Sequence, residues 1–298
     1  MAVVRLNMPM IDARIARIRS RWRQHISQAV VYSILVLFGL FSMLPLFFMV
    51  SGSLMTGNEI FSLMPHFLPE RPVFENYREL FARTNFLLYL RNSIIISVAQ
   101  TVGVLFFASL AGYVFAKRRF PGRNGLFLVA LTSTLLPNGQ MTMIPFYLLM
   151  VQLHWVNTFW PLIVPWWAPA LSIFLMRQYI ATGIPDELLE AARIDGCSMW
   201  RSYWRIVLPL SKPGLIVVGM MQFVSIWNDF LFGLLVLKRD ELRTVTVALI
   251  ELSTRTQQAT LYGPLFAGIV LATLPPVVIY LIFQRRLTQG ILSGALRG

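Results

Sequence analysis

A group of polar and aromatic side chains lies in the middle of the fifth apolar segment of the chain. The group consists of Gln222, Ser225, Trp227, Asn228 and Asp229. Polar residues within an apolar span are costly to place there and are often functional. Amide and carboxyl oxygens accept hydrogen bonds from hydroxyl groups of a solute, and an indole ring offers an apolar face for stacking. The group is therefore a candidate solute pathway. The alternative is that Asn228 and Asp229 bond to a neighbouring helix and fix its packing.

The third apolar segment holds a second candidate, at Pro137-Asn138-Gly139-Gln140. Proline within this segment removes a helical hydrogen bond, which breaks or kinks the helix. Irregular backbone at membrane depth is tolerated only where protein or water covers it. We therefore expect Asn138 and Gln140 to line a cavity.

Motifs for covalent chemistry are missing from the sequence. It has no G-x-x-x-x-G-K-[ST] phosphate loop, no H-E-x-x-H and no G-x-S-x-G. Cys197 is the only cysteine, which excludes an intrachain disulfide and a paired-cysteine metal site. The chain is predicted to bind no metal or cofactor, to hydrolyse no ATP by itself and not to be an enzyme.

The composition places most of these residues in a membrane. Hydrophobic residues make up 56% of the chain and charged residues only 13%, with a mean hydropathy of +0.64, whereas a soluble domain is about 25% charged. A span needs about 20 apolar residues, and the uniformly apolar runs are too long for barrel strands. The predicted fold class is an all-α integral membrane protein with six transmembrane helices, at residues 28–51, 92–115, 126–151, 159–176, 214–237 and 264–284.

The positive charges predict the orientation. Eighteen of the 26 Lys and Arg lie in the amino-terminal arm, the second and fourth connecting loops and the tail, and eight lie in the first and fifth loops. Because cytoplasmic loops carry the excess of Lys and Arg, both termini are predicted to be cytoplasmic. The orientation of the chain in the membrane then explains the net charge of +13, and no nucleic-acid partner is expected.

This orientation divides the chain into regions. The first apolar segment exceeds the 7–15 residues of a signal-peptide core, so we expect it to be a retained helix. The predicted regions are a cytoplasmic basic arm at 1–27, the first transmembrane helix at 28–51, an external loop at 52–91, a core of five transmembrane helices at 92–284 with a cytoplasmic insert at 177–212, and a cytoplasmic tail at 285–298.

The insert is predicted to form a helix–Gly–helix elbow. Pro185 suits a first helical turn and Gly196 a helix end, and Ser198 is expected to cap a second helix. Leu188, Leu189 and Ala192 are predicted to form one apolar stripe, and the second helix an apolar face of Trp200, Tyr203, Trp204 and Val207. Such a helix suits docking in the groove of a partner, and the alternative is an amphipathic helix lying on the bilayer surface.

The insert also resembles a known family. Its pattern EAA-x3-G-x9-I-x-L-P, from Glu190 to Pro209, is similar to the ATPase-docking loop of ABC import permeases. The motifs Asn92-Ser93-Ile94, Phe120-Pro121-Gly122-Arg123-Asn124, Leu136-Pro137-Asn138-Gly139-Gln140, Ile144-Pro145, Trp227-Asn228-Asp229-Phe230 and Phe283-Gln284-Arg285-Arg286 resemble the carbohydrate-uptake branch, of maltose and glycerol-3-phosphate type. The resemblance covers about residues 20–298.

The resemblance implies the type I ABC importer permease fold and a role in sugar import across the bacterial cytoplasmic membrane. The implied partners are a homologous second permease subunit, two ATPase subunits that bind ATP and Mg²⁺, and an extracytoplasmic solute-binding protein. Residues implied at the ATPase contact are Glu190, Ala191, Ala192, Asp195, Gly196, Ile206, Leu208 and Pro209.

Two other classes of protein compete with this interpretation. A membrane enzyme acting on a lipid-linked substrate would need paired carboxylates or histidines at a membrane face, and outside the insert the predicted internal loops carry no such pair. A non-transporting scaffold would tolerate changes at Asn228 and Asp229.

Overall fold

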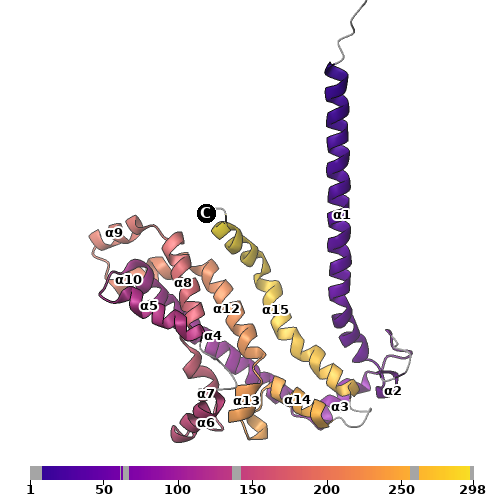
Figure 1. The fold of residues 1–298 in the computed structure, drawn as a ribbon. Coiled ribbons are helices and arrows are strands. Elements are labelled where there is room, and N and C mark those ends of the chain that lie inside the picture. The colour runs from indigo at the N-terminus through magenta and orange to yellow at the C-terminus, as the bar shows by residue number, and fades with distance from the viewer. Residues whose placement is uncertain (1–8, 61, 63–66, 136–141, 256–261, 296–298) are drawn as a thin grey trace, which may run out of the picture.

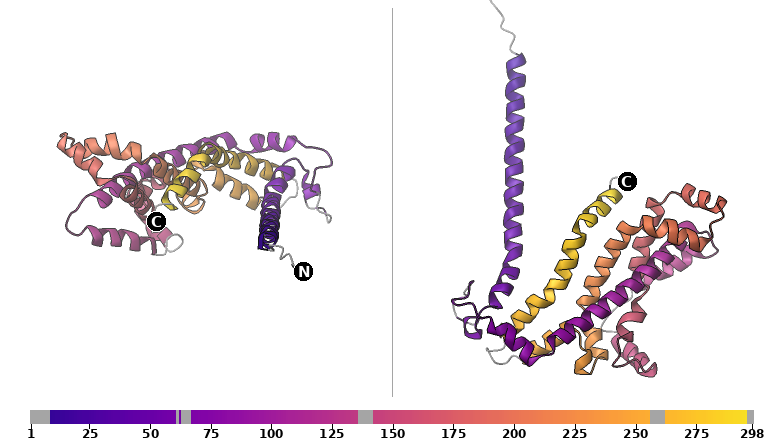
Figure 2. Two further views of the ribbon diagram at one scale, coloured as in Figure 1. Left: turned by 90° about the horizontal axis from the view of Figure 1, so that it is seen from above. Right: turned by 180° about the vertical axis from the view of Figure 1, so that it is seen from behind.

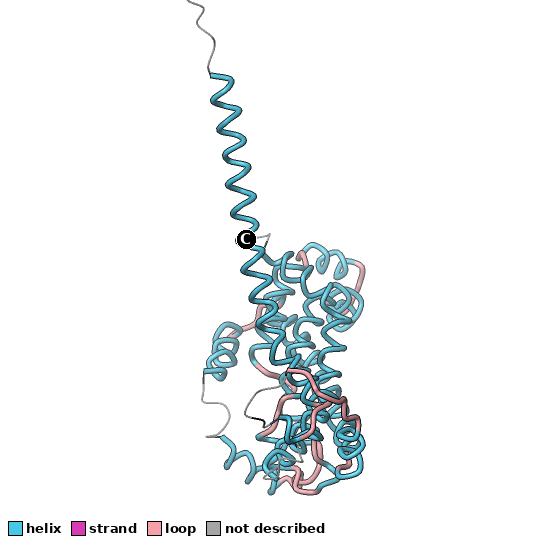
Figure 3. Tube along the Cα trace, turned by 90° about the vertical axis from the view of Figure 1, so that its right-hand side faces the viewer, coloured by secondary structure: helices cyan, strands magenta, loops and turns pink. Residues whose placement is uncertain are grey.

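The predicted all-α fold class is confirmed. The computed structural model describes residues 9–60, 62, 67–135, 142–255 and 262–295, and every regular element within these ranges is a helix (Figure 3). A helix satisfies its own backbone hydrogen bonds, which is what a chain surrounded by lipid requires.

Among the described residues, three helices are long and apolar enough to cross a membrane. They contain the stretches Gln28–Gly52, Phe86–Lys117 and Tyr262–Gln284, and they belong to α1 (Pro9–Gly52), α4 (Phe86–Lys117) and α15 (Tyr262–Ala295). These helices coincide with the predicted first, second and sixth spans, although α4 already begins at Phe86. Helix α1 contacts α15 near its carboxyl end, where the rings of Phe48 and Phe266 lie with centroids 5.8 Å apart, and most of its length stands away from the bundle (Figures 1 and 2).

The other three predicted spans are interrupted. Prolines at 161, 165 and 169 divide the fourth segment, since proline cannot continue the hydrogen-bond pattern of a helix. The predicted break at Pro137–Gln140 lies outside the described residues. The number of six spans stays a prediction. The pieces are α5 (Arg123–Thr132), η1 (Ser133–Leu135) and α6 (Met143–Gln152) in the third segment, α7 (Trp160–Ile163), η3 (Val164–Trp166) and α8 (Ala170–Gly183) in the fourth, and α12 (Lys212–Trp227) and α13 (Leu231–Val236) in the fifth.

The two predicted external loops contain helices that the sequence analysis did not foresee. Helix α3 buries Leu80, and Asn76 at its start donates hydrogen bonds from Nδ2 to the carbonyl oxygens of Ser53 (2.9 Å) and Met55 (2.8 Å). Tertiary contacts thus stabilise helices that are too short to be stable alone. The added elements are α2 (Gly57–Ile60), α3 (Glu75–Arg83), η5 (Asp240–Leu242) and α14 (Val245–Arg255).

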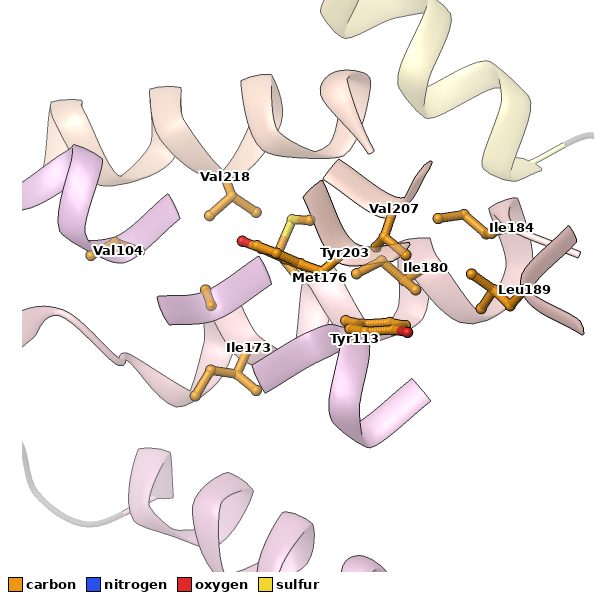
Figure 4. Packing of buried hydrophobic residues seen from close by; sticks show 11 residues of the cluster. Val104, Tyr113, Ile173, Met176, Ile180, Ile184, Leu189, Tyr203, Val207 and Val218 are labelled. Carbon is orange, nitrogen blue, oxygen red and sulfur yellow. The ribbon is translucent and has the colours of Figure 1, made fainter. Parts of the chain in front are cut away.

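Helix α4 is central to the packing, because it contacts both α8 and α12. A Cβ atom on Gly112 would lie only 2.8 Å from the backbone nitrogen of Arg177, so α4 and α8 approach each other backbone to backbone. Small residues allow such close approach in membrane helices. The buried cluster around this contact includes Tyr113, Met176 and Tyr203 (Figure 4).

Candidate functional site

The insert between α8 and α12 begins with a well-terminated helix, α9 (Asp186–Ile194). Asp186 and Glu187 occupy its first turn, where the helix dipole favours negative charge. At the other end, the Cys197 amide donates to the Ala192 carbonyl (2.8 Å) and the Gly196 amide to the Arg193 carbonyl (3.0 Å). These two bonds form a Schellman motif.

Gly196 makes the turn that follows α9. Its φ of +76° lies in the left-handed region, which glycine adopts without steric cost. A Cβ atom here would meet nothing within 4 Å, so the requirement for glycine is one of backbone conformation and not of space. The predicted helix stop at this residue is confirmed, and Pro185 is found one position earlier than expected, at the N-cap of α9.

The second half of the elbow is a series of short helical pieces. Ser198 caps its first turn, with Oγ accepting a hydrogen bond from the Arg201 amide (3.3 Å), as predicted. The whole run Met199–Leu210 meets α12 at an angle of 77°, which turns the chain back into the helix bundle. The pieces are α10 (Met199–Ser202), the π-helix η4 (Tyr203–Val207) and α11 (Leu208–Leu210).

The predicted apolar stripes were only half right. Leu189 and Ala192 are buried, but Leu188 is 46% exposed. On the second half Tyr203 and Val207 are buried, whereas Trp200 and Trp204 are about half exposed, with values of 52% and 51%. The wider π-helical turn of Tyr203–Val207 changes which side chains share a face.

The predicted ATPase-contact residues do not all lie on the surface. Glu190, Ala191, Asp195, Gly196 and Pro209 are exposed, Ile206 and Leu208 are partly buried, and Ala192 is buried. Among these, only Ala192 is buried, with 7% of its surface exposed. The placement of these residues in or beside the ATPase contact stays a prediction.

A buried lysine joins the insert to the end of α4. Lys117 Nζ donates to the Ile184 carbonyl (2.6 Å) and pairs with Asp186 Oδ1 (2.7 Å). The Lys117 side chain is only 7% exposed, whereas that of Asp186 is 73% exposed. The ammonium group therefore holds the junction between α8 and α9 against α4.

A buried tyrosine makes the second connection. The Tyr203 hydroxyl is hydrogen-bonded to Ser109 Oγ on α4 (2.8 Å), and its ring stacks on Tyr113 with centroids 6.1 Å apart (Figure 4). Since Tyr203 is 1% exposed, both halves of the elbow are fixed to the same helix.

A charged cleft of about 460 Å³ opens beside the insert. Glu190 and Arg193 of α9 line it together with Lys117, Arg118 and Arg119 at the end of α4. Its wall carries more positive than negative side chains.

Only some residues of the second candidate site, the predicted solute pathway in the helix bundle, lie close together. Gln222, Ser225 and Asp229 line one small pocket of about 160 Å³. Asn228 lies elsewhere, in a cavity of about 500 Å³ between α12, α14 and α15. Asn138 and Gln140 lie outside the described residues.

Trp227 lines the same cavity as Asn228. Its ring is 4% exposed, stacks on Phe223 with centroids 5.6 Å apart, and donates from Nε1 to the Ala272 carbonyl (3.1 Å). One face and the polar edge of the ring are therefore used for packing, and the sugar-stacking role of Trp227 stays a prediction.

The comparisons with known proteins decide the class. The family model described as "Binding-protein-dependent transport system inner membrane component" matches residues 82–293. The chain belongs to this family. It is a membrane permease subunit of a transport system, and the membrane-enzyme alternative is not supported.

Individual relatives agree with the family. The permease is 34% identical over 283 residues to the arabinooligosaccharides transport system permease protein AraQ of Bacillus subtilis, covering 92% of this chain and 99% of that one. It is 31% identical to the lactose transport system permease protein LacG of Rhizobium radiobacter, with 91% and 97% covered. A crystal structure of a bacterial ABC transporter involved in the import of the acidic polysaccharide alginate contains a chain of the same fold, with a TM-score of 0.77, 24% identity, and 88% and 97% covered.

Several residues of the permease site were missed from sequence. Lys117 was counted only as an orientation charge, and Gln100 and Trp166 were not singled out. Gln100 could have been found from the sequence, because it is a long polar side chain within the apolar stretch 92–115. Trp166 could not, since tryptophan is common in membrane proteins whatever its role.

Proposed function

We propose that this permease is one of two homologous membrane subunits of an ATP-driven importer for a sugar or sugar-like solute. Two ATPase subunits dock on the elbow at 177–212 and bind ATP and Mg²⁺, and an extracytoplasmic binding protein delivers the solute. The sugar class is supported by the names of the relatives AraQ and LacG. Both termini lie in the cytoplasm of a bacterial cell, with α9 on the same side.

The observation that carries the mechanism is the double attachment of the elbow to α4. Closure of the ATPase subunits moves α9 as a rigid body, because the Schellman motif and the Ser198 cap hold both ends of the turn. Lys117 and Tyr203 pass this movement to α4, and α4 contacts α8 and α12 in the bundle. Alternating access of the solute pathway follows from that displacement.

Gly196→Asp tests the docking role. Tagged permease is purified from membranes in mild detergent, and co-purifying proteins are identified by mass spectrometry. We expect the wild-type chain to bring down a second permease and an ATPase, and Gly196→Asp to lose the ATPase only. The substitution adds a charge to the proposed contact and forces a non-glycine residue into the left-handed region, at a cost of about 1–2 kcal/mol.

Gly122→Asp is the matched control. Gly122 has nearly the same backbone conformation, with φ of +78°, and likewise has nothing within 4 Å of its Cβ position, but it lies outside the elbow. Retention of the ATPase by Gly122→Asp isolates the contact from the backbone strain. Equal retention by both variants, or recovery of the wild-type chain alone, would contradict the proposal.

A further inference from the structure

A small polar pocket lies where α4, α12 and the segment before α8 meet. Gln222, Ser225 and Asp229 are spaced at i, i+3 and i+7, so they share one face of α12 and its end. That face lines the pocket of about 160 Å³. The other lining residues are Gln100 of α4, Trp166 of η3, and Leu162, Ile226 and Phe232.

Gln100 is the unexplained member of this pocket. It is 2% exposed, and its Oε1 atom has no hydrogen-bond partner among the described residues. An unsatisfied buried amide oxygen costs about 1–3 kcal/mol. A membrane protein that keeps such a group at this depth commonly uses it for a ligand or a transport path.

Asp229 adds a positioned acceptor to the same pocket. Its Oδ2 accepts a hydrogen bond from the Gly233 amide (3.0 Å), which fixes the direction of the carboxyl group. A carboxyl group has about four acceptor positions, so capacity for further donors remains. Hydroxyl groups of a solute would be such donors.

Trp166 provides an aromatic ring in the lining of the same pocket. Its ring contacts Phe232 (centroids 5.0 Å apart, 63° between planes) and Phe146 (6.1 Å), and Phe146 and Phe232 contact each other at 5.1 Å. Three mutually packed rings hold the indole in one orientation. The stacking role predicted for Trp227 therefore fits Trp166 better.

Among the described residues, no lysine, arginine or histidine lines the pocket. An acidic sugar would bring a charge into the bundle with no cation to pair with it, and an unpaired charge in an apolar medium is strongly disfavoured. A neutral sugar would meet the amide, hydroxyl and carboxyl groups of the lining together with the ring of Trp166. The volume is below the roughly 300–1,000 Å³ of pockets for drug-sized ligands, so it suits one ring at a time.

We propose that Gln100, Trp166, Gln222, Ser225 and Asp229 form a solute subsite that accepts one ring of a neutral sugar and rejects acidic sugars. The inference rests on the proposed transport function. It adds two residues to the pathway predicted from sequence, places Trp227 outside this pocket, and gives the site a charge preference.

The test uses the complete transporter, with its binding protein, in proteoliposomes. Four radiolabelled probes are supplied separately: lactose, arabinotriose and diacetylchitobiose as neutral sugars, and digalacturonate as an acidic one. We expect ATP-dependent uptake of at least one neutral probe and none of digalacturonate. Uptake of no probe, without stimulation of ATPase activity by the binding protein, would reject the proposed function itself. Uptake of digalacturonate at a rate similar to the neutral probes would reject the charge preference.

Substitutions then test the subsite in a complex that transports. Gln100→Leu and Trp166→Ala are each expected to lower kcat/KM for uptake by about tenfold or more, while ATPase activity stays stimulated by the binding protein. Gln152→Leu and Trp160→Ala are the matched controls, since both side chains are exposed, and they should stay within about twofold of wild type.

A conservative variant separates binding from packing. Gln100→Asn keeps an amide and is expected to restore part of the lost uptake, with a thermal unfolding temperature in detergent like that of Gln100→Leu. Unchanged uptake in both Gln100→Leu and Trp166→Ala would overturn the subsite. A fall in uptake that follows a loss of thermal stability in every variant would also overturn it, since the residues would then be structural.

Discussion

Replacing Lys117 by methionine should loosen the elbow without unfolding the bundle. The Lys117 ammonium donates to the Ile184 carbonyl at 2.6 Å and pairs with Asp186 at 2.7 Å. Ile184 is 1% exposed, so water replaces the lost donor poorly. Methionine keeps most of the length and apolar volume of the lysine stem while removing the charge.

The size of the effect follows from the exposure of the two partners. Leaving a buried carbonyl without its donor costs about 1–3 kcal/mol. The ion pair adds less than about 1 kcal/mol, because the Asp186 side chain is 73% exposed and well screened. A loss of about 2 kcal/mol should raise the rate of amide hydrogen exchange in α9 by roughly 30-fold.

The assay is hydrogen exchange with mass spectrometry on the purified transporter, combined with sugar uptake. Asp186→Asn should change exchange in α9 by less than about fivefold, and Lys212→Met, at an exposed lysine of the same insert, should change nothing. We expect uptake to fall in Lys117→Met while the ATPase subunits still co-purify. Unchanged exchange in Lys117→Met, or an equal effect of Asp186→Asn, would refute the role given to the buried ammonium group.

Three further substitutions test the contacts around the elbow and the bundle. Tyr203→Phe removes the 2.8 Å hydrogen bond to Ser109 and should destabilise the detergent-solubilised protein by about 1 kcal/mol. The measurement is the thermal unfolding temperature, which should fall, and an unchanged temperature would contradict the contact. Gly112→Val places a branched side chain 2.8 Å from the Arg177 backbone and should separate α4 from α8. The amount of folded protein recovered by size-exclusion chromatography should therefore fall sharply, and full recovery would show that the helices are not in contact. Asn92→Leu removes the side-chain donor to the carbonyls of residues 241 and 243 (2.8 and 3.0 Å). The segment 238–244 should then be more susceptible to limited proteolysis, and equal cleavage of the variant and the wild-type protein would argue against this attachment.

The sequence predicted the long helices and the ends of the elbow well, because both depend on local properties. The first and last spans follow from apolar length alone, and α1 ends at Gly52, one residue from the prediction. Gly196 and Ser198 act through the backbone conformation and hydrogen bonds of their own neighbours. Tertiary structure has little influence on such signals.

The rotation of each helix about its axis was not predictable in the same way. Apolar residues surround a membrane helix on all sides, so the sequence does not mark the face that packs against protein. Trp227 was expected to offer its ring to a solute and is 4% exposed, while Gln100 was passed over and lies in the polar pocket. Leu188 was misplaced because neighbouring elements decide which side of α9 is covered.

The central claim is that the elbow at 177–212 contacts the ATPase subunits, and Cys197 allows a direct measurement of it. It is the only cysteine of the chain, it is partly exposed, and it directly follows Gly196. Labelling it with benzophenone-4-maleimide in membranes that hold the complete transporter, followed by irradiation, records which protein lies next to the elbow.

A second variant moves the label to the predicted external loop, by combining Cys197→Ser with Arg71→Cys. We predict that the label at Cys197 cross-links to an ATPase subunit and that the label at position 71 does not. Cross-linking of the Cys197 label only to lipid or to the external binding protein would contradict both the docking role and the orientation of the chain.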